Sequence, residues 1–176
     1  MIYYISDLHF NHEGIIRLCH RPYSSIKEMN EDLINKWNNK VKAEDTVYFL
    51  GDFSFKCPSQ DSISFLARLN GKKYFIKGNH DKKSLLDTFK HMGLIEDYYI
   101  YTEIVDNNRR VVLFHYPIED WNGQYRGSYH LYGHVHNCVN GYRNITNRFN
   151  VSAEVIGYEP VTLDELIQNQ EIRRAN

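Results

Sequence analysis

A repeated order along the chain limits its possible folds: short apolar, β-rich runs are followed at once by Asp, Asn or His. The first three runs cover residues 1–6, 46–50 and 73–77. Between them, residues 25–41 and 58–69 carry apolar side chains at helical spacing. Alternating strands and helices are typical of α/β proteins with parallel strands, so we expect an α/β fold.

The second half of the sequence has a different pattern. Side chains alternate in character over 98–105, and an Asn-Asn turn leads to the apolar run 111–114, which predicts a hairpin. A further short strand is predicted over 129–132. The tail is expected to be strand-like over 149–161 and helical over 163–172, and no catalytic residue is assigned to it.

Potential metal ligands follow five of the predicted strands. Because sites in open α/β sheets lie beyond the carboxyl ends of the strands, we expect these side chains to converge. Carboxylate, carboxamide and imidazole groups without cysteine suit divalent ions such as manganese, iron or zinc. The predicted metal ligands are Asp7, His9, Asp52, Asn79, His115, His134 and His136. Seven ligands suffice for two adjacent ions, a pair that favours in-line displacement at phosphorus, and His80 is left over for catalysis.

The motifs resemble those of the calcineurin-like metallophosphoesterases: Asp-x-His, Gly-Asp, Gly-Asn-His-(Asp/Glu), His and Gly-His-x-His. Every element is present in this order between Asp7 and His136. The resemblance implies a four-layer α/β/β/α sandwich of two mixed sheets, with the metal pair at the carboxyl ends of the strands.

The resemblance also implies a division of roles. One ion would be held by Asp7, His9 and His136, the other by Asn79, His115 and His134, with Asp52 bridging both. Of the possible ions, manganese is favoured. His80 would contact the phosphate and stabilise the transition state or protonate the leaving group.

The sequence departs from the family pattern at Phe55. Protein phosphatases of the family carry an Asp at this position, which orients the catalytic histidine, so phosphoprotein phosphatase activity is disfavoured. What orients His80 is left open, since Asp81 is adjacent in sequence but need not face it.

Two further residues are candidates for substrate binding. His12 extends the first motif and would reach the substrate beside the first metal; a loop histidine at a helix start is an equally weighted interpretation. Arg21 has the planar donors that match a phosphate, although an unpaired loop arginine is more often solvated. The remaining histidines, His20, His91 and His130, are assigned surface or half-buried structural roles.

Composition limits the remaining possibilities. With 176 residues and 42% hydrophobic content, the chain is expected to form a single domain over 1–176. A net charge of −1 argues against a protein that grips duplex nucleic acid. Three cysteines lack paired spacing, and no apolar run is long enough for a membrane span. Because no secretory leader precedes the first strand, a cytoplasmic location is expected.

The leading hypothesis is a hydrolase of a small phosphodiester or phosphomonoester, with a nucleotide as one candidate substrate, that works by in-line attack of a metal-bridging hydroxide. A nuclease acting on short or single-stranded nucleic acid is the alternative within the same class. Tyr116, Trp121, Tyr125 and Tyr129 would then form a stacking wall, although core or rim packing is the more common role. A non-catalytic metal-binding scaffold is the alternative of a different class, disfavoured because every motif is intact.

Overall fold

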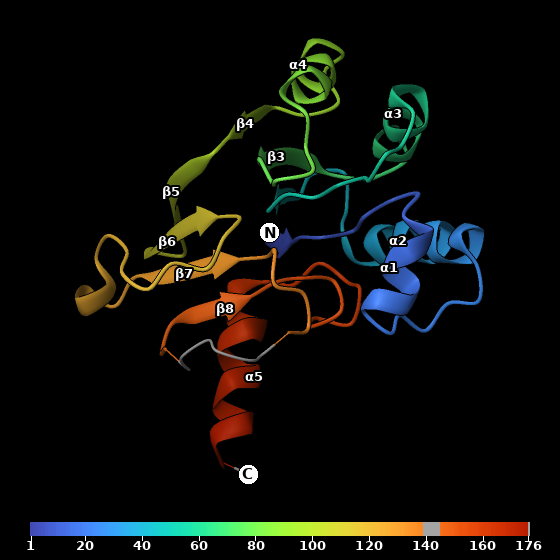
Figure 1. The fold of residues 1–176 in the computed structure, drawn as a ribbon. Coiled ribbons are helices and arrows are strands. Elements are labelled where there is room, and N and C mark those ends of the chain that lie inside the picture. Colours follow the sequence, from blue (N-terminus) through green and yellow to red (C-terminus); the bar gives the residue numbers. More distant parts are fainter. Residues whose placement is uncertain (139–144, 176) are drawn as a thin grey trace.

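The computed structural model describes residues 1–138 and 145–175 (Figure 1). Its elements are β1 Ile2–Ile5, α1 Glu13–Leu18, α2 Ile26–Lys40, β2 Thr46–Phe49, α3 Ser59–Ala67, β3 Lys72–Ile76, α4 Lys83–His91, β4 Asp97–Tyr99, β5 Tyr101–Asp106, β6 Arg109–Phe114, the 3-10 helix η1 Gln124–Arg126, β7 Tyr129–Tyr132, β8 Arg148–Asn150 and α5 Leu163–Ala175.

The first sheet contains four parallel strands in the order β1-β2-β3-β4. Helices α2, α3 and α4 connect successive strands, so the predicted strand-helix-strand order is confirmed. The start of α2 is fixed by Ser25, whose Oγ accepts the N–H of Glu28. Parallel strands joined in this way end at the same edge of the sheet, which brings the loops after β1, β2 and β3 together.

The second sheet is mixed, in the order β5-β6-β7-β8. β5 and β6 form the predicted antiparallel hairpin, and the turn residues Asn107 and Asn108 have φ values of 48° and 63°, as a two-residue hairpin turn requires. β7 and β8 run parallel to β6. Two mixed sheets were expected, but the four strands of the first sheet are all parallel. Among the described residues, the antiparallel pairing at this sheet is a single isolated bridge between Tyr4 of β1 and Val161.

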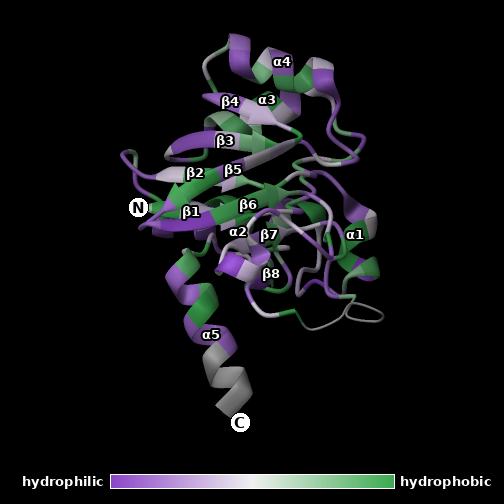
Figure 2. Ribbon diagram, turned by 90° about the vertical axis from the view of Figure 1, so that its left-hand side faces the viewer, coloured by the Kyte–Doolittle hydropathy of each residue, from purple (hydrophilic) through white to green (hydrophobic). Residues whose placement is uncertain are grey.

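Two apolar cores separate the layers. The first lies between the first sheet and its helices and contains the fully buried rings of Trp37, Phe49 and Phe75. The second lies between the sheets, where Tyr4, Leu50 and Ile76 meet Val111, Leu113 and Leu131. Figure 2 shows the hydrophobic strands in the middle of the molecule, with α4 and α5 at opposite ends. The expected α/β architecture of two packed sheets with helices is confirmed.

The outer face of the second sheet is covered by the segment between β6 and β7. Trp121 of this segment packs on the ring of His130, and the Ile118 N–H donates to His130 Nε2. His130 is therefore fully buried, whereas a surface or half-buried position was expected. Helix α5 contributes Leu163 and Leu166 to the core between the sheets. In the described part of the chain no helix is long and apolar enough to cross a membrane.

The prediction of a strand-like tail over 149–161 is wrong for most of its length. The strand ends at Asn150, and only single bridges at Ser152 and Val161 follow within the described tail. Gly157 and Tyr158 have positive φ, which no regular strand tolerates. The tail therefore turns beside β1, and its residue Ser152 lies next to Ser6, where the loop after β1 begins.

Candidate metal centre

The seven predicted metal ligands lie on loops after strands β1, β2, β3, β6 and β7. Five of them have left-handed backbone conformations with φ between 50° and 69°: Asp7, His9, Asp52, His134 and His136. Such a conformation costs a residue with a Cβ of order 1–3 kcal/mol and persists only where the surrounding structure enforces it. Strain repeated at the same loops marks them as a functional site.

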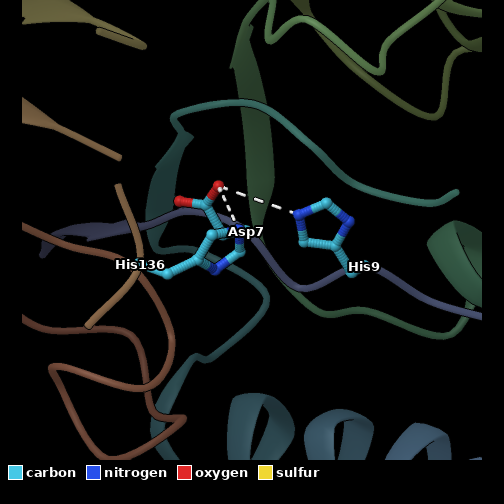
Figure 3. Close-up of side chains that lie close together, drawn as sticks. All are labelled: Asp7, His9 and His136. Carbon is cyan, nitrogen blue, oxygen red and sulfur yellow. Dashed lines mark ion pairs between the residues drawn. The ribbon is translucent and has the colours of Figure 1, made fainter. Parts of the chain in front are cut away.

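The first group of ligands is formed by Asp7, His9 and His136. Nε2 of His9 and Nε2 of His136 each lie 3.9 Å from Oδ1 of Asp7, and Figure 3 shows both rings directed at this carboxylate. The His9 side chain is 2% exposed, and neither of its ring nitrogens has a hydrogen-bond partner among the described residues. Burial lowers the pKa of His9 far below its ordinary value, so the ring is neutral and offers a lone pair.

Asp7 is held mainly through one of its carboxylate oxygens, Oδ2. Its Oδ2 accepts hydrogen bonds from Ser6 Oγ at 2.5 Å and from Ser152 Oγ at 2.9 Å. The His134 N–H also donates to this carboxylate, at 3.0 Å from Oδ2 and 3.2 Å from Oδ1. Oδ1 points towards His9 and His136, as a metal ligand would.

Asp52 joins the first group to the second. Its Oδ2 lies 3.6 Å from Nε2 of His9 and 3.6 Å from Nε2 of His115. Burial raises the pKa of Asp52 to about 6, although the facing His115 acts in the opposite direction. The position between two sets of nitrogen ligands is the one that a bridging carboxylate occupies.

The second group consists of Asn79, His115 and His134. Oδ1 of Asn79 lies 2.9 Å from Nε2 of His115 and 2.9 Å from Nδ1 of His134. His115 Nδ1 must donate to the carbonyl of Leu50, 2.7 Å away, because a carbonyl oxygen can only accept. With a proton on Nδ1, His115 directs Nε2 at the Asn79 oxygen, an arrangement that a cation between them would stabilise.

His80 lies at the accessible side of Asp52. Its backbone N–H donates to Asp52 Oδ1 at 2.9 Å, and its Nε2 is 3.8 Å from Asp52 Oδ2. The ring stands edge-on to Phe55 with the centroids 4.8 Å apart, and the side chain is 37% exposed. The contact with Phe55 restricts the orientation of the His80 ring.

Asp81 does not face the ring of His80. Its carboxylate accepts the N–H groups of Gly78 at 2.8 Å, Asp52 at 2.9 Å and Phe53 at 3.1 Å. Asp81 therefore ties the loop after β3 to the loop after β2. Gly78 is required at this junction because a Cβ there would collide with the carboxylate of Asp52.

The two predicted substrate-binding residues have different environments. His12 occupies the N-cap position of α1, and its ring centroid lies 4.1 Å from that of Phe55 and 5.3 Å from that of His9, so it lies beside the first group. Burial lowers the pKa of His12 to about 4. The expectation for Arg21 is wrong: its side chain is completely buried and its guanidinium donates to protein groups, so it faces neither substrate nor solvent.

Glu154 is a site residue that the sequence did not reveal. Its carboxylate lies 3.2 Å from Nδ1 of His136, and it also accepts from Arg21. Cys19 approaches the same pair, since ligand atoms of Cys19, His136 and Glu154 lie within 4.8 Å of one another. The tail was interpreted as a strand without site residues, and only its turn brings Glu154 to the centre.

Of the four aromatic residues proposed as a stacking wall, Tyr116 contacts the ligands. Its ring centroid lies 4.5 Å from that of His134 and 5.1 Å from that of His115. Trp121 is buried, Tyr129 stacks on Phe149, and Tyr125 is exposed. Of the four, Tyr116 is therefore the residue placed to stack on a substrate, at the rim of the second group.

A family model of the calcineurin-like phosphoesterases matches residues 1–169. The chain belongs to this family. Its two sheets have the family architecture, and its activity is the metal-dependent hydrolysis of phosphate esters. Divalent metal ions are the cofactors that the family and the buried carboxylate-histidine groups imply.

Relatives with the same extent occur in distant organisms. The uncharacterized protein MJ1445 of Methanocaldococcus jannaschii is 39% identical, covering 95% of this chain and 89% of its own. The gene 66 protein of Mycobacterium phage L5 is 26% identical, covering 83% and 82%. Among solved structures, AQ665 of Aquifex aeolicus, a protein of unknown function, has a TM-score of 0.77 at 26% identity, covering 96% and 98%. An archaeal phosphodiesterase shares the fold, with a TM-score of 0.54 at 19% identity over 94% of each chain.

Proposed function

We propose that this protein hydrolyses small phosphodiesters, nucleotides among them, at two adjacent divalent ions. The observation that carries the proposal is the pair of ligand groups that share Asp52: the buried rings of His9 and His115, one from each group, both direct Nε2 at Oδ2 of its carboxylate. Asp7, His9 and His136 would hold one ion, and Asn79, His115 and His134 the other. Oxygen and nitrogen ligands without a thiolate suit manganese, iron or zinc, and of these manganese is the ion that we propose.

When bound, the two ions would supply activation of a water molecule and neutralisation of the phosphate charge, which favours in-line displacement. The chain's own residues do the rest. His80 would donate a hydrogen bond or a proton to the phosphate or the leaving group, because its ring is accessible and lies next to the shared carboxylate. Phe55 would keep this ring in place.

The surroundings of the centre favour a diester over a monoester. Tyr116 lies at the end of the second group, and His12 with Phe55 lies at the end of the first. A phosphodiester carries an organic group on each side of the phosphate, and both ends of the centre present an aromatic surface to such groups. Stacking on aromatic faces is how nucleobases bind without sequence preference.

The first test compares bis-p-nitrophenyl phosphate with p-nitrophenyl phosphate, using chelator-treated protein to which manganese is returned. We expect faster diester turnover that requires manganese. His80→Ala should lower turnover while two ions still bind, Asp52→Ala should lose ions and activity together, and His91→Ala, an exposed histidine on α4, should change neither. Full activity of His80→Ala and Asp52→Ala would contradict the proposal.

Whether the substrate is a nucleotide is tested with two diesters that release the same p-nitrophenolate: thymidine 5′-p-nitrophenyl phosphate and methyl p-nitrophenyl phosphate. Tyr116→Leu should raise the KM for the thymidine ester about tenfold, the equivalent of about 1.4 kcal/mol of stacking, and leave the methyl ester unchanged. Tyr125→Leu, an exposed tyrosine without a ring contact among the described residues, is the control. Equal effects on both esters would contradict a nucleobase at Tyr116.

Two other outcomes would replace the proposal. Preferred cleavage of short single-stranded oligonucleotides would indicate a nuclease. Two bound ions without turnover of any of these esters would indicate a metal-binding scaffold.

A further inference from the structure

A charged pair without a role in the reaction lies buried beside the first ligand group. Nε and Nη2 of Arg21 donate to Oε1 of Glu154 at 2.8 and 2.6 Å. The side chains are 0% and 3% exposed. Burying two charges is unfavourable unless further hydrogen bonds satisfy them, so the remaining contacts of the pair show what it holds.

The remaining donors of Arg21 bind the loop that carries the first two ligands. Nη1 donates to the Leu8 carbonyl and Nη2 to the Asp7 carbonyl, both at 2.7 Å. Asp7 and His9 have φ values of 58° and 53°, a conformation that needs external support. The planar guanidinium fork supplies it by binding successive carbonyls in one fixed geometry.

The remaining contact of Glu154 orients the third ligand. Its Oε1 and Oε2 lie 3.2 and 3.3 Å from Nδ1 of His136. A carboxylate at Nδ1 fixes the proton on that nitrogen, which leaves Nε2, directed at Asp7, as the ligand atom. Cys19 also approaches this carboxylate, but Arg21 already neutralises Glu154, so the three do not form a separate cation site.

We infer that Arg21 and Glu154 act as a positioning pair that sets the geometry and the affinity of the first metal position alone. The inference rests on the proposed function, since it assumes that Asp7, His9 and His136 bind an ion. Asn79, His115 and His134 have no contact with either member of the pair among the described interactions. The second position should therefore be independent of it.

The test is calorimetric titration of chelator-treated protein with manganese, which reports the two positions as separate binding events. We expect Glu154→Gln to weaken one event by 10- to 100-fold, on the order seen for residues behind metal ligands, and to leave the other unchanged. Arg21→Lys, which keeps the charge but not the fork, should weaken the same event.

Glu31→Gln is the matched control, because Glu31 pairs with Arg68 on the surface and is 46% exposed. It should leave both events unchanged. If wild-type protein bound no manganese, the proposed function would fail; if it bound two ions and Glu154→Gln did so with the same affinities, only the positioning role would fail. Equal weakening of both events by Glu154→Gln and Arg21→Lys would also overturn the inference.

Discussion

Asp81 offers a quantitative test of how the centre is built. Its buried carboxylate accepts three backbone N–H groups, those of Gly78, Asp52 and Phe53. Leaving one buried N–H without an acceptor costs about 1–3 kcal/mol. Asp81→Ala leaves all three N–H groups without their acceptor, so we expect the free energy of unfolding to fall by about 3 kcal/mol or more.

Asp81→Asn separates these contributions. Oδ2 of Asp81 serves Gly78 and Asp52, while Oδ1 serves Phe53. An amide oxygen in the place of Oδ2 retains two of the three bonds, and its NH2 group cannot accept the third. The expected loss is about 1–3 kcal/mol, between wild type and Asp81→Ala.

The assay is urea unfolding followed by tryptophan fluorescence, with a chelator present so that metal binding does not contribute. Asp87→Ala is the control, because the Asp87 carboxylate has side-chain partners at the exposed surface and, within the described part of the chain, accepts from no buried backbone group. A loss for Asp81→Ala no larger than for Asp87→Ala would refute the reasoning. So would equal losses for Asp81→Ala and Asp81→Asn.

Three further outcomes are expected. A Cβ in Gly133→Ala would collide with the Asp7 carboxylate, so manganese binding in a calorimetric titration should weaken. Each manganese ion, at 100 times its Kd, should stabilise the protein by about 2.7 kcal/mol in thermal unfolding, and the total should be smaller in His9→Ala. Burial lowers the pKa of His130 to about 4 from 6.5, so this residue favours unfolding as the pH falls between these values, by about 3 kcal/mol. His130→Gln should therefore show a shallower loss of stability over that range in urea unfolding; an unchanged slope would contradict the assignment.

Local patterns in the sequence were sufficient to predict the strands after which the ligands lie. The runs before Asp7, Asp52 and Asn79 end where the strands end, because an apolar run fixes the buried strand and the following polar residues can only leave the sheet. The shared edge then follows from parallel connectivity. This is why the convergence of these loops at one edge could be anticipated without coordinates, whereas the division of the ligands into two groups was an implication of the family resemblance.

Contacts between distant segments could not be anticipated in this way. Arg21 and Glu154 are 133 residues apart, and neither has a neighbour in sequence that indicates a partner. Glu154 reaches the centre only because the tail turns instead of continuing as a strand. His130 likewise is buried by a loop rather than by its own strand, and periodicity carries no information about what covers a sheet face.

The long separation between the ligands of the first group bears on biosynthesis. Asp7 receives hydrogen bonds from His134 and Ser152, which follow it by 127 and 145 residues. During translation, β1, β2 and β3 leave the ribosome well before these partners exist. A nascent chain can therefore build its first sheet while its hydrolytic centre is still incomplete, and the order of synthesis withholds activity until the tail has folded back beside β1.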